Sequence, residues 1–100
     1  MYKIEYANKT VINSLKNLRS FERRRILDSI DSQLRNEPGV RTKHRKPVID
    51  LIPPWEYGGL VWELSIGEYR VFYDLDAAAK IVHIRAIRHK PPHKTTEEIL

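Results

Sequence analysis

The sequence of 100 residues contains no cysteine, which excludes disulfide bonds, thiolate nucleophiles and cysteine-ligated metal sites. No apolar run approaches the ~20 residues that a transmembrane helix needs, and the start of the chain, MYKIEYANK, lacks the apolar stretch of a signal peptide. We therefore expect a cytoplasmic protein. The four histidines form no recognised ligand motif, so the sequence implies no metal and no other cofactor.

The residues that are present are those of one globular domain spanning 1–100. Apolar residues make up 41% of the chain and include two Trp, five Tyr and two Phe, more than a disordered chain would carry. A chain of 100 residues has room for one core. The net charge of +5 suits a nucleic acid or an acidic protein segment, although a merely basic surface explains it equally well.

The first third of the sequence predicts a strand and two helices. Residues 2–6 alternate apolar and polar side chains, which is the period of a strand with one buried face. Asn8 is expected to cap a helix whose apolar residues recur at helical spacing. Ser20 is expected to cap a second helix that continues to Asn36, where Glu37-Pro38-Gly39 ends it. With almost no linker between them, the helices should form a helical hairpin.

The remainder predicts a basic loop followed by three strands. Residues 41–46, RTKHRK, are the most basic stretch, and 47–59 contain three prolines and two glycines, so we expect little regular structure across 41–59. Strand-like runs follow at 61–66, 69–75 and 81–88, and one helical turn is expected near 95–100. The predicted fold class is α+β, a two-layer β-α-α-β-β-β domain.

Turn lengths predict which side chains share a face of the sheet. Gly67-Glu68 fits a two-residue turn that pairs Ile66 with Tyr69, and a four-residue loop over 76–79 would pair Leu75 with Lys80. This register predicts one continuous apolar face for the helices to cover, made of Trp62, Leu64, Ile66, Tyr69, Val71, Tyr73, Val82, Ile84 and Ala86.

The opposite face of the predicted sheet carries the charged side chains. Its members are Glu63, Ser65, Arg70, Phe72, Asp74, Ile81, His83, Arg85 and Ile87. Arg70 should lie between Ser65 and Arg85, and two adjacent arginines repel unless an anion or a carboxylate bridges them. Either Glu63 or Asp74 neutralises the pair within a solvated face, or the pair marks an anion-binding site.

The segments VWELSIGEYRVFYDLD and IVHIRAIRHK, in this order and spacing, resemble the RelE/ParE superfamily of bacterial toxin–antitoxin toxins, and the RelE side most closely. The resemblance covers most of the chain, including the helical hairpin and the basic segment RTKHRKP. It implies a RelE-like fold, with the hairpin packed on a mainly antiparallel sheet, and a cognate antitoxin as partner. The apolar Phe72, Ile81 and Ile87 on the charged face favour that face as the docking site of an antitoxin segment.

The activity that the resemblance implies is ribosome-dependent cleavage of messenger RNA, which inhibits translation. A ribose 2′-hydroxyl attacks the adjacent phosphate without a metal, so the site needs a proton acceptor, positive charge and a donor for the leaving oxygen. The arginine of the family's Y-R-V-F-Y motif matches Arg70, whose fork of donors suits two phosphate oxygens. The basic residue beyond the family's last strand matches Lys90, with His89 beside it, and the loop arginine matches Arg45 less securely.

The sequence departs from the RelE pattern on the strand that precedes the Gly67 turn. Val61 and Glu63 stand where the best-known RelE enzymes carry lysines. Glu63 is then a candidate general base, Lys43 or Lys46 would supply charge from the loop, and Arg45 and Arg85 complete the expected RNA-binding set. Two alternatives stay open: a ParE-like inhibitor of DNA gyrase that acts by binding and uses no catalytic residues, or an inactive homologue, consistent with the missing lysines, that serves as a binding module.

Overall fold

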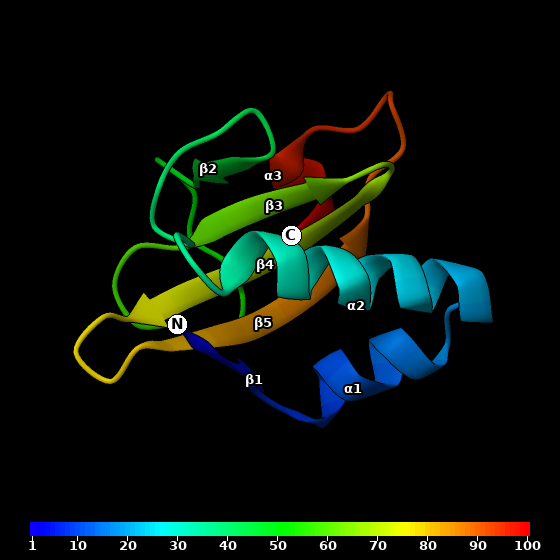
Figure 1. Cartoon of the computed structure of the whole chain (residues 1–100). Helices are drawn as coiled ribbons and strands as arrows, with labels where there is room; N and C mark the ends of the chain where they lie inside the picture. The colour runs from blue at the N-terminus through cyan, green and yellow to red at the C-terminus, as the bar shows by residue number, and fades with distance from the viewer.

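The computed structural model describes residues 1–100 as one five-stranded sheet with two helices on one face (Figure 1). The strand order is β1-β5-β4-β3-β2, antiparallel except for the parallel pair β1 and β5. This arrangement confirms the predicted two-layer α+β domain. The elements are β1 (Lys3–Tyr6), α1 (Lys9–Lys16), α2 (Ser20–Leu34), β2 (Arg45–Pro47), β3 (Trp62–Ile66), β4 (Tyr69–Asp76), β5 (Ile81–His89) and α3 (Thr96–Ile99).

The start of α1 is as predicted, whereas the start of α2 differs. The Asn8 side chain accepts a hydrogen bond from the Val11 N–H at 3.0 Å, which satisfies one of the free donors of the first turn. The predicted Ser20 cap of α2 is wrong, because Arg19 occupies the cap position without a side-chain bond and Ser20 already lies in the helix. No helix of the protein is long and apolar enough to span a membrane.

The span 41–59, predicted to lack regular structure, contains the short edge strand β2. It pairs antiparallel with β3, with Lys46 opposite Glu63. Its outer edge is closed, since the backbone N–H and C=O of Arg45 both bond to Thr42 and Pro47 has no N–H to offer. The alternation of side chains over three residues is too short to predict a strand. β2 is defined by its pairing with β3.

The β3–β4 register is confirmed, and the turn chemistry explains it. Ile66 pairs with Tyr69, and Gly67 has a φ of 57° whereas Glu68 does not have a positive φ, as a type II′ turn requires.

The predicted β4–β5 register is wrong. Leu75 pairs with Val82 rather than with Lys80, because the loop occupies 77–80 and Lys80 closes it in the left-handed conformation, with a φ of 56°.

A bulge in the β4–β5 ladder reverses the faces of the second half of β5. Tyr73 pairs with Ile84 and Phe72 with Ala86, so one residue of β5 has no counterpart in β4. The predicted positions of Ala86 and Ile87 are therefore wrong. Ile87 packs in the core beneath the helices, and Ala86 packs on the opposite face.

Two apolar clusters hold the layers together. The large one lies between the helices and the sheet, and Tyr73 donates a hydrogen bond from its buried hydroxyl to the Pro38 carbonyl at 2.8 Å. The small cluster lies on the other face of the sheet, where Figure 1 shows α3 behind β3 and away from α2. Its buried members are Val61, Phe72 and Ala86, and Trp55, Ile99 and Leu100 pack against them.

Candidate functional site

Arg70 lies at the start of β4 and is held in place by the turn that precedes it. Its Nη1 donates to the carbonyl oxygens of Gly67 and Tyr69, both at 2.8 Å, and its side chain is only 16% exposed. Tyr69 is itself fixed to α2, because its hydroxyl donates to Glu22 Oε2 at 2.6 Å, a bond that raises the pKa of Tyr69. The tight turn and α2 together position the Arg70 guanidinium.

The like-charged neighbour of Arg70 is Arg88, and the predicted neighbour Arg85 is wrong. Arg70 and Arg88 face each other directly in the β4–β5 ladder. Arg88 donates from Nε to the Ile99 carbonyl at 3.1 Å, and its guanidinium lies 5.2 Å from the centre of the Trp55 ring. Arg85 instead forms a two-point contact with the buried Asp74, with its Nε 2.7 Å from Oδ2. The same bulge that turns Ile87 toward the helices also places Arg88, in place of Arg85, opposite Arg70.

Glu63 is the carboxylate of this site, and it is buried. Its side chain is 1% exposed, with Arg70 Nε at 3.7 Å and Lys46 Nζ at 3.8 Å from its Oε1. The Thr96 hydroxyl donates to its Oε2 at 2.8 Å. Because Lys46, Arg70 and Arg88 provide three cations against one carboxylate, the cluster keeps a net positive charge.

The C-terminal segment covers the apolar part of this face, a contact that the sequence pattern does not predict. Thr95 forms a capping box with Glu98, and this short helix places Ile99 and Leu100 against the Phe72 cluster. Trp55 adds a tilted contact to Phe72, with ring centres 5.2 Å apart. The expectation of an open apolar docking face is therefore wrong for Phe72, which the chain covers itself, and for Ile87, which faces the helices.

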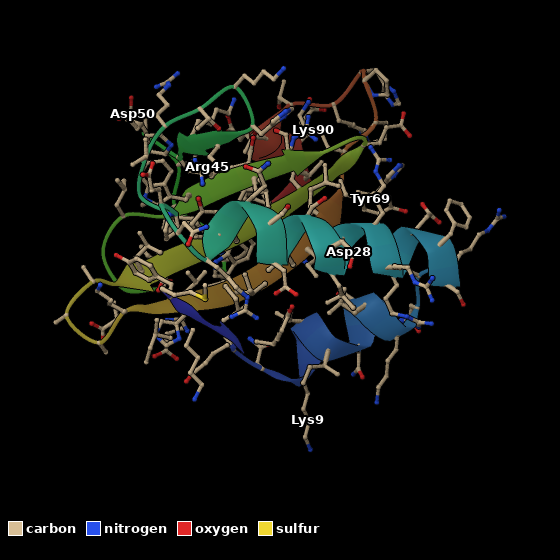
Figure 2. The ribbon with its side chains drawn as sticks, in the orientation of Figure 1. Lys9, Asp28, Arg45, Asp50, Tyr69 and Lys90 are labelled. Atoms are coloured by element: carbon tan, nitrogen blue, oxygen red, sulfur yellow. The ribbon has the colours of Figure 1, made fainter.

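His89 and Lys90 lie at the same end of the sheet as Arg70. The Lys90 N–H donates to the Glu68 carbonyl at 2.6 Å, and His89 Nε2 is 3.4 Å from Glu68 Oε2 (Figure 2, which labels Lys90). The His89 ring packs against Tyr69, with ring centres 5.2 Å apart, while 53% of its side chain remains exposed. The structure thus brings Arg70, His89 and Lys90 to the turn end of β4 and β5, with the His89 side chain on the helix-facing side of the sheet beside Tyr69. Glu63 is the second residue of β3 and joins this group through its side-chain contact with Arg70.

The predicted loop residues divide into two groups. Lys46 reaches the site through Glu63, and Lys43 is exposed in the loop before β2. Arg45, labelled in Figure 2, is buried, and its Nη1 donates to the Gln33 carbonyl, so it ties the loop to α2. No group of three His, Asp or Glu side chains is placed to hold a metal ion.

Comparisons with known proteins define the fold. No protein-family model and no curated protein matches the sequence. Among solved structures, a chain of the archaeal RelE–RelB complex from Pyrococcus horikoshii OT3 is similar, with a TM-score of 0.68 and 24% sequence identity. The match covers 94% of this chain and 98% of that chain. The comparison confirms the predicted architecture: the chain has the RelE-like fold.

Proposed function

We propose that the protein is the toxin of a toxin–antitoxin system and cleaves messenger RNA on the ribosome without a metal. The observation that supports this proposal is the Arg70 cluster, in which a rigidly held guanidinium lies beside Arg88 and Lys46 with a single carboxylate to neutralise them. A surplus of fixed cations is suited to a phosphate whose charge grows in the transition state. The structural neighbour comes from a complex with RelB, so we propose an antitoxin partner for this chain too.

The proposed reaction transfers a phosphoryl group within the RNA, from O5′ to O2′. The ribose O2′ loses its proton to a base and attacks the phosphorus, the bond from phosphorus to O5′ breaks, and O5′ takes up a proton. The products are a 2′,3′-cyclic phosphate and a 5′-hydroxyl. Arg70 Nη1 is engaged by two carbonyls, which leaves Nη2 to donate to a phosphate oxygen.

Within this proposal His89 moves the proton and Glu63 positions Arg70. The His89 imidazole lies beside Tyr69 at the turn end of the sheet and is exposed, and its ring nitrogens can both accept and donate a proton. Glu63 bonds to Thr96, and its side chain is only 1% exposed. Lys90 and the exposed Lys43 would add positive charge along the RNA, whereas Arg45 and Arg85 are engaged within the protein.

The test compares Arg70→Ala with Arg24→Ala on ribosomes programmed with a defined messenger. Arg24 is exposed on α2, away from the Arg70 cluster, and its replacement removes the same charge. Loss of one transition-state donor should reduce the cleavage rate by roughly 10²-fold for Arg70→Ala, with little change for the control. Undiminished cleavage by a folded Arg70→Ala protein, with folding checked by circular dichroism, would contradict the assignment.

The burial of Glu63 favours a second candidate, a non-catalytic inhibitor of DNA gyrase. A carboxylate that already neutralises Arg70 and Lys46 leaves less charge for a phosphate than a lysine in its place would. A gyrase supercoiling assay separates the two functions. Inhibition of supercoiling by a protein that leaves ribosome-bound messenger intact would establish the second function and exclude the first.

A further inference from the structure

A polar cavity lies between α2 and the end of β3, outside the Arg70 cluster. Its volume is about 390 Å³. Ile66 is the one apolar residue of its lining, which consists of Arg25, Ser29 and Gln33 from α2, His44 from the loop before β2, and Ser65, Ile66 and Gly67 at the turn. Hydroxyl, amide, imidazole and guanidinium groups are all able to donate hydrogen bonds, so the lining is chemically matched to an oxyanion.

The charge at this cavity is positive and is not neutralised. No Asp or Glu lines it, and Arg25 takes part in none of the ion pairs of the structure. Of the acidic residues on α2, Glu22 accepts from Tyr69, and Asp28 lines a separate surface hollow beside Arg24. An exposed arginine without a carboxylate partner keeps its full capacity to bind a phosphate.

Gly67 places the Arg25 guanidinium against the β3–β4 turn. A Cβ atom at position 67 would lie 2.9 Å from Nη1 and 3.0 Å from Nη2 of Arg25, so a glycine is what permits this approach. The carbonyl of the same Gly67 accepts from Arg70. Arg25 and Arg70 therefore both contact one glycine, with the cavity at Arg25 and the proposed site of cleavage at Arg70.

We propose that this cavity binds a second phosphate group of the RNA strand, with Arg25 as its principal donor. Because both arginines contact Gly67, a single strand crossing the turn would present one phosphate to Arg70 and another to Arg25. A free phosphate ion would use only one of these positions. The proposal deepens the proposed function and rests on it for the identity of the strand, whereas binding at the cavity is measurable without any cleavage.

The test uses a short RNA made of 2′-O-methyl nucleotides, which cannot be cleaved because the attacking hydroxyl is blocked. Amide and imidazole resonances are followed by NMR during titration of the wild type, Arg25→Gln and the matched control Arg24→Gln. Signals of Ser65, Gly67 and His44 should shift. Loss of a charge-assisted bond should weaken binding roughly tenfold for Arg25→Gln, and the control should stay within about twofold because it alters only diffuse attraction.

Inorganic phosphate forms the second arm of the experiment. The proposal predicts that phosphate shifts the same cavity signals but binds far more weakly than the RNA, since it lacks the contact at Arg70. Equal weakening by both substitutions, shifts confined to other residues, or phosphate binding as tight as RNA would each overturn it. The spectra also report whether each variant is folded, and a wild type that binds the probe but cleaves no messenger would refute the nuclease proposal alone.

Discussion

Replacing Glu63 with glutamine should destabilise the protein although the side chain keeps its shape. Glu63 is buried, and its carboxylate faces Arg70 Nε at 3.7 Å, Lys46 Nζ at 3.8 Å and the Thr96 hydroxyl at 2.8 Å. The glutamine amide keeps an acceptor for Thr96 but removes the negative charge. Arg70 and Arg88 then face each other across β4 and β5 without a counter-charge.

The magnitude follows from the exposure of each partner. Changing the Thr96 bond from charged to neutral should cost about 1 kcal/mol, because bonds to charged groups are worth roughly twice as much as neutral ones. The largely buried Arg70 should contribute about 1 kcal/mol after allowance for solvent screening, whereas Lys46, with its side chain 53% exposed, contributes little. The sum of about 2 kcal/mol corresponds to a fall in Tm of roughly 10 °C for a domain of this size.

Urea unfolding followed by tryptophan fluorescence measures this change, with Glu97→Gln as the matched control. Glu97 is exposed on α3 and forms no ion pair, so its replacement should alter the free energy of unfolding by less than about 0.5 kcal/mol. Salt should restore part of the stability lost in Glu63→Gln, because it screens the repulsion between the partly exposed Arg70 and Arg88 guanidinium groups. A Glu63→Gln variant as stable as the wild type would show that Glu63 does not neutralise the charges of Arg70 and Lys46.

Two further predictions concern the core and the turn. Tyr73→Phe should cost about 1 kcal/mol at neutral pH through the lost bond to Pro38. Burial raises the pKa of Tyr73, so wild-type stability should fall above about pH 10 as the unfolded tyrosine ionises first, and pH-dependent unfolding should show a shallower fall in the variant. Gly67→Ala should cost about 1–2 kcal/mol in urea unfolding because of its φ of 57°. Gly58→Ala, whose added Cβ would meet only an Asp74 oxygen at 3.9 Å, should cost much less, and equal costs would count against the strained turn.

The parts of the site that could be predicted are those encoded by local patterns. The two-residue turn at Gly67 defined the position of Arg70 relative to Ser65, and the structure keeps that pairing. The family resemblance then pointed to Arg70, and the structure places His89 at the same turn. The identity of the arginine opposite Arg70 could not be predicted, because it depends on the length of the loop between β4 and β5 and on the bulge in their ladder.

The sequence by itself determined the order of the elements, the amphipathic helices and the alternation that buries Leu64, Val71 and Tyr73, since these features repeat within a few residues. Only the tertiary structure decided the faces of Ala86 and Ile87, the short strand β2 and the covering of the Phe72 face by the C-terminal segment. The physical reason is that strand pairing has a period of two. One extra residue in β5 moves every later side chain to the other face, and only contacts between distant segments select where that residue lies.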